Sequence, residues 1–420
     1  MGGEWKRVQF SDAVWVNPPV PLKRGENYPF VEMQNVNPSE RAARSKQSRP
    51  FTGGGARFAA GDTLMARITP CLENGKTARF VSEDDQAIAH GSTEFIVIRG
   101  RPGVSDTNFA YYLTRWREVQ DFAISQMTGT SGRQRVPTEA LSHLTVPLPP
   151  LPEQKAIASV LGALDDKIEL NRRTNETLET MARAVFKSWF VDFDPVHAKS
   201  KDLQPDGMDA DTAKLFPSSF VDFEIGRVPK GWKVVPIYEI ADVIYGAPFS
   251  SALFNDKEGG RPLIRIRDLP KECPGVWTPE VHPKGYLVHA GDVVVGMDGE
   301  FRAYLWGGSD AWLNQRVCVF VPRQGVSAAF VRESISGLLA EVEATETATT
   351  VIHLGKNDID RFKVIVPDPQ VLAGFNRHCQ PLYDAVIAKK QESRTLACQR
   401  DALLPRLLSG ELTVPASKVA

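Results

Sequence analysis

The stretch LPEQKAIASVLGALDDKIELNRRTNETLETMARAVFKSWF, residues 151–190, decides the fold of this chain. From Ile157 to Trp189, the positions reached by alternating steps of four and three residues are mostly apolar. An apolar position every 3.5 residues on average is the signature of a helix in a coiled coil. At 1.5 Å per residue, the stretch from Glu153 to Phe190 predicts a helix about 57 Å long.

The same seam returns 218 residues later, between Phe375 and Leu407. Both seams are polar at their centres, which predicts one shared layer that sets the register, as a buried Asn does in coiled coils. If the helices run antiparallel, centre meets centre, as in two copies of one unit related by a pseudo-twofold axis. Pro381 is expected either to kink the second helix or to mark its true start. The seam residues expected to set the register are Leu161, Leu164, Ile168, Asn171, Asn175, Leu178, Leu382, Val386, Lys389, Ser393, Leu396 and Leu403.

A globular region precedes each helix, and these regions also repeat. The repeated segments, first half before second, are Trp5-Lys6 and Trp232-Lys233, GDTLMA (61–66) and GDVVVG (291–296), EFIVI (94–98) and RVCVF (316–320), and ALSHLTVPLPP (140–150) and DIDRFKVIVPDP (358–369). A helical hairpin that merely stabilises an unrelated protein is the alternative, but it would not need a domain before each helix. Short strands and helices with many Gly and Pro turns predict an α+β domain in each half.

The predicted fold class is therefore α+β, with two globular domains in tandem and two long helices that form an antiparallel coiled coil. Residues 192–220 are rich in Pro, Asp, Lys and Ser and are expected to form a solvated crossing loop. The predicted segments are 1–150 (first domain), 151–191 (first long helix), 192–226 (acidic crossing linker), 227–366 (second domain), 367–410 (second long helix) and 411–420 (C-terminal tail).

Charge is distributed unevenly along the chain. The net charge is −1, yet residues 1–152 carry 18 Lys and Arg against 15 Asp and Glu, and residues 153–226 carry 9 against 14. This distribution permits a DNA-binding face outside the linker without demonstrating one. Five scattered cysteines favour a reducing compartment, and no apolar run approaches the roughly 20 residues of a membrane span. A cytoplasmic location without membrane contact is expected.

Two short motifs resemble catalytic signatures. Asn17-Pro18-Pro19-Val20 is similar to the NPPF/Y tetrapeptide of N6-adenine methyltransferases, but Val20 replaces the aromatic residue that would stack on a flipped base. Asn74-Gly75-Lys76-Thr77 is similar to the end of a phosphate-binding loop, but Pro70 stands where the first glycine belongs. We interpret the first motif as an extended Pro-rich turn and expect neither a catalytic residue nor a metal site. A self-contained methyltransferase is the weaker alternative.

The first helix and its flanks resemble a known family. VPLPPLPEQKAIASVLGALDDKIELNRRTNETLETMARAVFKSWFVDFDPV, residues 146–196, is similar to the first conserved region of the specificity (S) subunits of type I restriction-modification systems, the HsdS family. LLPRLLSGEL, residues 403–412, is similar to the end of their second conserved region. The second helix begins differently, because Pro367-Asp368-Pro369-Gln370 replaces the usual P-x-x-E-Q.

The resemblance implies a function in phage defence. Each target-recognition domain would read one half of a bipartite, asymmetric target in double-stranded DNA, and the helices would set the spacer between the half-sites. The helices would also dock two modification (M) subunits, which bind S-adenosylmethionine and methylate adenine N6. A restriction (R) subunit, where present, would add cleavage driven by ATP with Mg. This chain itself would hold no cofactor. A coiled-coil scaffold that assembles partner subunits without sequence-specific DNA contact is the second hypothesis.

Reading DNA requires Arg, Lys, Asn and Gln side chains that reach phosphates and base edges. The candidates in the first domain lie in ARITPCLENGK (66–76) and GTSGRQRVPTEAL (129–141), and they are Arg67, Thr69, Asn74, Lys76, Ser131, Arg133, Gln134 and Arg135. The candidates at comparable places in the second domain are Arg265, Arg267, Arg302, Gln315, Arg316, Lys356 and Asn357. The alternative interpretation for any single one is a solvated surface side chain.

Overall fold

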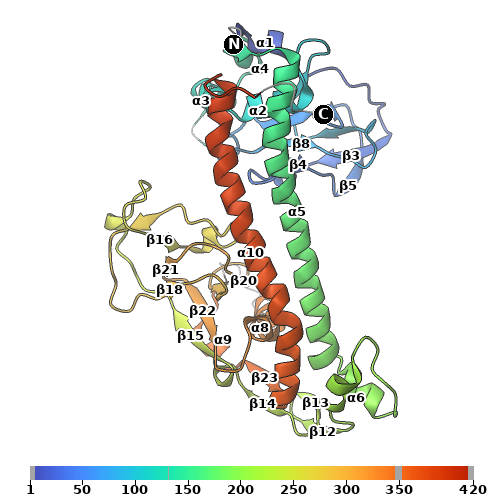
Figure 1. Cartoon of the computed structure of the whole chain (residues 1–420). Helices are drawn as coiled ribbons and strands as arrows, with labels where there is room; N and C mark the ends of the chain where they lie inside the picture. The colour runs from blue at the N-terminus through green and yellow to red at the C-terminus, as the bar shows by residue number, and fades with distance from the viewer. Residues whose placement is uncertain (1–4, 131, 346–351, 415–420) are drawn as a thin grey trace. The chain divides into compact units, whose positions relative to one another are not determined.

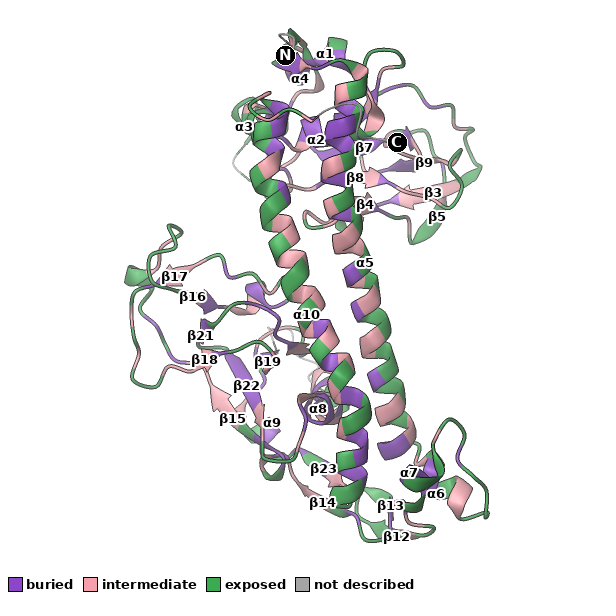
Figure 2. Cartoon of the chain, in the orientation of Figure 1, coloured by how far each residue is buried: buried purple, intermediate pink, exposed green. Residues whose placement is uncertain are grey.

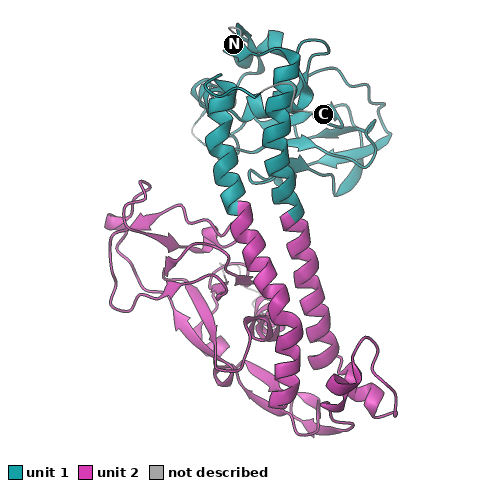
Figure 3. Ribbon diagram, in the orientation of Figure 1, with its two compact units in different colours: residues 1–170, 394–420 teal, residues 171–393 magenta. Residues whose placement is uncertain are grey.

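The computed structural model describes residues 5–130, 132–345 and 352–414. Its contacts divide the chain into two compact units, drawn in different colours in Figure 3. Unit 1 comprises Met1–Leu170 and Arg394–Ala420, and unit 2 comprises Asn171–Ser393. Each unit thus combines one globular domain with one half of each long helix, α5 (Leu151–Phe190) and α10 (Pro369–Leu408) (Figure 1).

The domain of unit 1 has two main sheets. The larger has the strand order β2 (Val14–Val16), β10 (Phe95–Gly100), β7 (Thr63–Ala66), β8 (Thr77–Phe80) and β4 (Ala42–Ala43). The smaller has the order β5 (Gln47–Pro50), β3 (Asn27–Val31), β9 (Ile88–Gly91) and β6 (Ala56–Ala59). A third pair joins β1 (Lys6–Gln9) to β11 (Thr145–Leu148). The helices of this domain are α1 (Phe10–Ala13), α2 (Thr107–Arg115), α3 (Arg117–Ser125) and α4 (Thr138–Ser142), with the 3₁₀ turn η1 (Met33–Asn35).

The domain of unit 2 has the same plan. Its first sheet has the order β15 (Ala241–Tyr245), β22 (Val317–Pro322), β19 (Val293–Gly296) and β20 (Ala303–Leu305). Its second has the order β17 (Trp277–Thr278), β16 (Arg261–Ile264), β21 (Ala311–Leu313) and β18 (Leu287–Val288). β14 (Lys233–Pro236) pairs with β23 (Lys363–Val366). The other elements of the domain are α8 (Ala328–Thr345), α9 (Lys356–Ile359) and the 3₁₀ turns η2 (Ile237–Glu239), η3 (Ser251–Leu253) and η4 (Ile266–Asp268).

Strand pairing shows that the repeat seen in the sequence is a repeat of fold. β10 pairs antiparallel with β2 and β7, as β22 does with β15 and β19. In the second sheet, β3 runs parallel to β9 and β16 runs parallel to β21. Two α+β domains in tandem, with two long helices, confirm the predicted fold class.

The repeated Gly-Asp pair is a structural turn. Gly61 and Gly291 precede β7 and β19 with φ of +90° and +100°, a backbone conformation that favours glycine. The carboxylates of Asp62 and Asp292 each accept a hydrogen bond from the main-chain N–H three residues earlier, at 2.7 and 2.8 Å. These residues therefore repeat because the same tight turn starts the same strand.

α10 continues through Pro381, since it begins at Pro369 and ends at Leu408. The expectation that Pro381 marks the start of this helix is therefore wrong. A proline inside a helix removes one hydrogen bond, but Phe375 and Cys379 on the preceding turns are fully buried. Tyr383 and Val386 on the following turns are buried as well, so burial of this face stabilises the helix on both sides of the proline.

The long helices pack antiparallel within unit 2. The side-chain amide of Asn171 donates hydrogen bonds to Glu392 (2.8 Å) and Ser393 (3.3 Å). Toward the other end of this half, the ring centroids of Phe190 and Phe375 are 5.2 Å apart. The polar centre expected from the two seams is thus a layer in which Asn171 meets Ser393.

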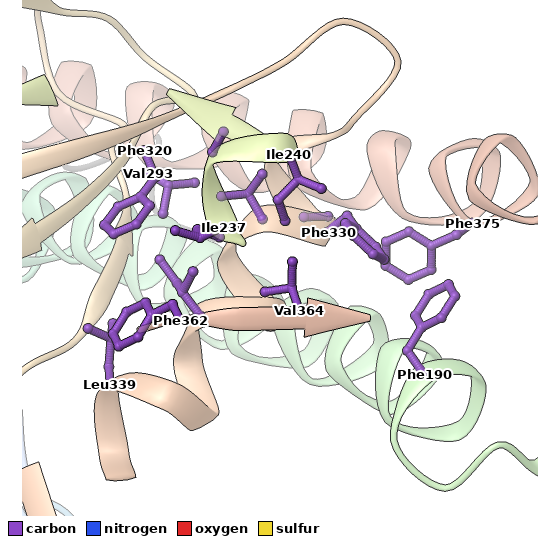
Figure 4. Close-up of a cluster of buried hydrophobic side chains, with 14 of the residues drawn as sticks. Phe190, Ile237, Ile240, Val293, Phe320, Phe330, Leu339, Phe362, Val364 and Phe375 are labelled. Carbon is purple, nitrogen blue, oxygen red and sulfur yellow. The ribbon is translucent and has the colours of Figure 1, made fainter. Parts of the chain in front are cut away.

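The largest core lies in unit 2, where the helix pair meets the domain. Phe190 from α5, Phe330 from α8 and Phe375 from α10 meet with ring centroids 5.2–5.9 Å apart (Figure 4). In unit 1, much of α2 is buried (purple in Figure 2). Its residue Phe109 packs in one cluster with Leu161 of α5 and Leu407 of α10. Each domain is therefore joined to its half of the helix pair by a continuous apolar core.

The acidic segment between the halves is folded rather than simply solvated. It contains α6 (Asp194–Lys199), α7 (Ala210–Lys214) and a hairpin of β12 (Phe220–Phe223) and β13 (Gly226–Pro229). Val196 and Phe216 are buried in the core of unit 2, and Asp209 caps α7 by accepting from two main-chain N–H groups. The expectation of a loop was wrong for these elements, because it weighed the polar residues and overlooked these apolar anchors, whereas Asp192, Lys201 and Asp206, among others, are exposed to solvent as expected.

Candidate nucleic-acid interface

The structure brings together the two candidate segments of the first domain. Thr69 N–H donates to the Gln134 carbonyl (3.0 Å), and Gln134 N–H donates to the Thr69 hydroxyl (3.1 Å). Val136 N–H donates to the Arg67 carbonyl at 2.9 Å, and Ile68 and Arg135 form an isolated antiparallel bridge. We call residues 67–69, 94 and 133–136 the unit 1 junction.

An ion pair stands at this junction. The Nε and Nη2 atoms of Arg135 donate to the Glu94 carboxylate at 2.8–3.0 Å, and this contact raises the pKa of Arg135. The Arg135 side chain is 44% exposed and that of Glu94 is 22% exposed, so the guanidinium still reaches solvent. Glu94 was not among the predicted site residues, although it begins the repeated segment EFIVI.

A hollow of about 580 Å³ adjoins the junction and is lined by Arg67, Arg57, Thr93 and Phe95, among others. The guanidinium of Arg57 lies 4.8 Å from the centre of the Phe51 ring. Arg57 was missed because it stands alone in the sequence, and only the pairing of β6 with β9 brings it here. The site thus gains a further cation in unit 1.

A second hollow, of about 660 Å³, shares Gly55 and Thr93 with the first. Its lining includes Arg49, whose guanidinium lies 4.2 Å from the centre of the Phe30 ring. Guanidinium groups over aromatic faces remain able to donate hydrogen bonds in the ring plane. Arg49 is a second cation that the sequence pattern did not indicate, although it also pairs with Glu32 in the lining of this hollow.

Asn17, the first residue of the methyltransferase-like motif, has a structural role. Its main-chain N–H donates to Val97 O at 2.7 Å, and its side-chain carbonyl accepts from Val97 N–H at 2.8 Å. Its φ of +50° turns the chain away from β2 toward the prolines. This geometry agrees with the interpretation of the motif as a Pro-rich turn.

The remaining candidates of the first domain lie in different settings. Asn74 is exposed in the loop between β7 and β8, and Arg133 is exposed at the junction. The Lys76 ammonium donates to the Met33 carbonyl at 2.9 Å, which directs it toward η1. Ser131 lies outside the described residues.

Unit 2 has a junction at the matching place. Asp298 and His353 form an isolated bridge there, Met297 N–H donates to the Arg316 carbonyl (2.9 Å), and Leu354 N–H donates to Met297 O (2.8 Å). His353 Nδ1 lies 2.7 Å from the Asp298 carboxylate, and Arg316 Nη1 lies 3.8 Å from it. We call residues 297–298, 316 and 352–354 the unit 2 junction.

The two junctions match in backbone but not in charge. In unit 1, the junction joins the end of β7, the residue before β10 and the segment before α4. In unit 2, it joins the end of β19, the residue before β22 and the segment before α9. In this frame, Arg316 occupies the place of Glu94, and His353 occupies the place of Arg135. The expectation that candidates in both halves occupy comparable places therefore needs correction for Arg316, which stands opposite an acidic residue of the first half.

The other candidates of unit 2 lie beside or away from its junction. Gln315 is exposed next to Arg316, and Arg302 is exposed and pairs with Glu300 (2.9 Å). The Lys356 ammonium pairs with Asp360 (2.7 Å). The last three candidates lie at η4 and in α9. Arg265 pairs with Asp268 at η4, and Arg267 is exposed there. Asn357 is exposed in α9.

Within the described ranges, no three His, Cys, Asp or Glu side chains are grouped so as to hold a metal ion. Among the helices of those ranges, none combines the length and the apolar character that a membrane crossing requires.

Residues 21–180 and 229–377 match the model of the family described as Type I restriction modification DNA specificity domain. The chain therefore belongs to the family of type I restriction-modification specificity subunits, which confirms the resemblance seen in the sequence.

Relatives of the chain have the same description. It is 26% identical over 417 residues to the type I restriction enzyme HindI specificity subunit of Haemophilus influenzae, covering 84% of this chain and 86% of that protein. It is 27% identical over 323 residues to the MjaIX specificity subunit of Methanocaldococcus jannaschii, covering 73% and 69%. The chain is also similar in structure to the type I restriction-modification S subunit from M. genitalium, known from its crystal structure. The superposition covers 96% of each chain with a TM-score of 0.50 and 16% sequence identity, which shows a shared fold.

Proposed function

We propose that this specificity subunit is non-catalytic and selects DNA for a type I restriction-modification complex, each unit reading one half of a bipartite, asymmetric target. The observation that carries this proposal is the pair of matching junctions. Each presents a half-exposed guanidinium, Arg135 or Arg316, on an equivalent backbone frame. The side chains around the two guanidinium groups differ, Glu94 in unit 1 and His353 with Asp298 in unit 2, so the two half-sites would differ, as in an asymmetric target.

Cations around the unit 1 junction suit contact with the DNA backbone. Arg57 and Arg67 line the hollow beside the junction, and Arg133 is exposed next to Arg135. Contacts to phosphates position a protein on the duplex, whereas contacts to base edges specify the sequence. This local group of cations explains how a chain with a net charge of −1 could still bind DNA.

The long helices would dock two M subunits and set the spacer. α5 and α10 are 40 residues each, so each spans about 60 Å. The repeat offers two similar helix surfaces, which suits two copies of one partner better than one copy. Adenine N6 methylation, with S-adenosylmethionine, would reside in the M subunits, and ATP and Mg would belong to an R subunit if one is present. Such a complex would act on DNA in the cytoplasm.

The test uses the complex of this chain with its M subunits. Methylation sequencing of host DNA gives the motif for the wild type and for Arg133→Ala with Arg135→Ala. We expect the double variant to change or weaken recognition in one half-site, because both residues lie in unit 1. Equal damage to both half-sites would contradict the assignment of one half-site to each unit.

A scaffold without sequence-specific contact is the competing function, favoured by the near-neutral net charge. The two functions differ in salt-dependent binding of the complex to short duplexes. A complex that recognises a DNA sequence binds its bipartite target more tightly than a scrambled duplex at the same ionic strength. Equal binding to both duplexes would support the scaffold.

A further inference from the structure

We infer that Arg135 and Arg316 each read a guanine in their half-site, and that Glu94 and Asp298 are positioning residues that orient these arginines. This inference rests on the proposed function and assigns base reading to particular side chains. Arginine pairs with the O6 and N7 atoms of guanine through two parallel hydrogen bonds, which requires a guanidinium held in one orientation.

The geometry of Arg135 supplies that orientation. Its main-chain N–H and C=O both pair with Thr128, at 2.9 and 3.0 Å, while its other side bridges to Ile68. Glu94 takes the edge formed by Nε and Nη2, and Nη1 also contacts the Arg133 carbonyl at 3.4 Å. The end of the fork formed by Nη1 and Nη2 therefore faces away from the Glu94 carboxylate. That end has the shape that a guanine edge accepts.

Arg316 is held differently, since its Nη1 atom lies 3.8 Å from the Asp298 carboxylate. Its φ is +71°, a conformation that costs energy for any residue with a side chain and that is concentrated at functional sites. Its Nη1 atom lies 3.2 Å from His353 Nδ1, and that ring in turn lies against Asp298. The side chain is 57% exposed. The strained backbone therefore carries a guanidinium that is more than half exposed at the unit 2 junction.

The carboxylates are otherwise unexpected at a DNA interface. A negative charge there repels phosphates, and exposed ion pairs contribute little to stability. Yet each junction has a carboxylate. In unit 1 it belongs to Glu94, the residue before β10, and in unit 2 it belongs to Asp298, which follows Met297 after the end of β19. Holding a guanidinium in place before binding lowers the entropy lost when it meets a base, which accounts for the acid in each case.

The experiment measures the affinity of the complex with M subunits for duplexes that carry its methylation motif or single base-pair changes in it. Arg135→Lys keeps the charge but loses the fork, so we expect about ten- to hundredfold less discrimination at one G·C pair of one half-site. Glu94→Gln should lower discrimination at that same pair while raising affinity for all duplexes, because a repulsive charge is lost. Arg316→Lys and Asp298→Asn should act in the same way on the other half-site.

Matched controls come from exposed arginine–carboxylate pairs away from the junctions. Arg117→Lys in unit 1, which disturbs the pair with Asp121, and Arg323→Lys in unit 2, which disturbs the pair with Asp242, should leave all discrimination unchanged. Unaltered discrimination in the half-site read by the other unit shows that each variant complex is assembled.

Two results would overturn the inference. One is unchanged discrimination at every position with Arg135→Lys and Arg316→Lys, and the other is a half-site without a G·C pair. In both cases the wild-type complex still prefers its own motif, so the proposed function survives. A wild type that binds motif and scrambled duplex equally would instead remove the proposed function itself.

Discussion

The hydroxyl of Tyr112 in α2 donates a 2.7 Å hydrogen bond to the carboxylate of Asp165 in α5, and both residues are buried. At the matching place in unit 2, Tyr383 of α10 donates at 3.0 Å to Glu333 of α8. Tyr383 lies 218 residues after Asp165. Glu333 lies six residues after Ser327, whose side chain caps α8, just as Tyr112 lies six residues after Asp106, which caps α2. The tyrosine and the acid have therefore exchanged helices between the halves while the bond between domain and long helix is kept.

Arginine neutralises the acid in unit 1. Arg400 of α10 pairs with Asp165 at 2.7 Å, and both side chains are less than a tenth exposed. Burial raises the pKa of Tyr112, and the nearby Asp165 charge raises it further. The hydroxyl thus keeps its proton and remains a donor, which holds α2, α5 and α10 together in unit 1.

Tyr112→Phe should lower the free energy of unfolding by about 1–3 kcal/mol, because the buried Asp165 loses a hydrogen-bond donor. Urea denaturation measures the loss. Tyr28→Phe, which removes a surface hydroxyl bonded to Glu26, is the matched control and should change the free energy by less than about 0.5 kcal/mol. Equal effects of the two substitutions would show that the buried hydrogen bond to Asp165 stabilises the protein no more than a surface hydrogen bond does.

Arg400→Met should be more damaging, at about 3–5 kcal/mol, because it leaves a buried carboxylate without its counter-charge. Adding Asp165→Asn removes that charge while keeping an acceptor for Tyr112, so the double variant should be more stable than Arg400→Met alone. The control is Arg406→Met, whose partner Glu411 is exposed. Additive losses in the double variant would contradict the pairing.

Asn171→Leu should raise the midpoint of thermal unfolding and loosen the register of the helices. Asn171 is fully buried, and a buried polar seam residue specifies register at a cost in stability. Methylation sequencing should then reveal more than one spacer length. Leu164→Ile on the same seam should keep a single spacer. A single spacer with Asn171→Leu as well would exclude a register role.

A heptad inserted after Asn175 in α5, with a second heptad inserted before Lys389 in α10, should lengthen the spacer. The two sites face each other because Asn171 meets Ser393 and each helix continues by one turn in opposite directions. Seven residues add about 10 Å of helix, or about three base pairs at 3.4 Å each. Insertion in α5 alone should instead disrupt the helix pair. An unchanged motif with both insertions would contradict the role of the helices in setting the spacer.

Much of the fold was predictable because its signals are local. The 3.5-residue seam depends on side chains that lie within one helix, and the same seam in both halves predicted two long helices and a polar layer between them. Asn171 bonded to Ser393 follows from that pattern. The Gly-Asp turns repeat for an equally local reason, since the carboxylate bonds to the chain three residues before it.

The candidate site was predictable only in part. The segments around Arg67 and Arg135 were marked by their polar and basic residues, and the structure places them side by side. Arg57 and Glu94 were missed, because strand pairing and not sequence proximity brings them to the junction. Arg316 begins the segment that the sequence repeat aligns with Glu94, and the structure keeps it at that place.

By itself, the sequence determined the two long helices, the seam along each of them, the repeated α+β plan and the family, because each depends on short-range periodicity or on motifs within a single segment. Only the tertiary structure decided which charges meet. The exchange of tyrosine and acid between Tyr112–Asp165 and Tyr383–Glu333 depends on contacts between residues about 50 positions apart. The junctions around Arg135 and Arg316 likewise arise from loops that meet only after the sheets have formed. Hydrogen bonds and ion pairs of this kind do not recur at a fixed spacing along the chain, so no pattern in the sequence predicts them.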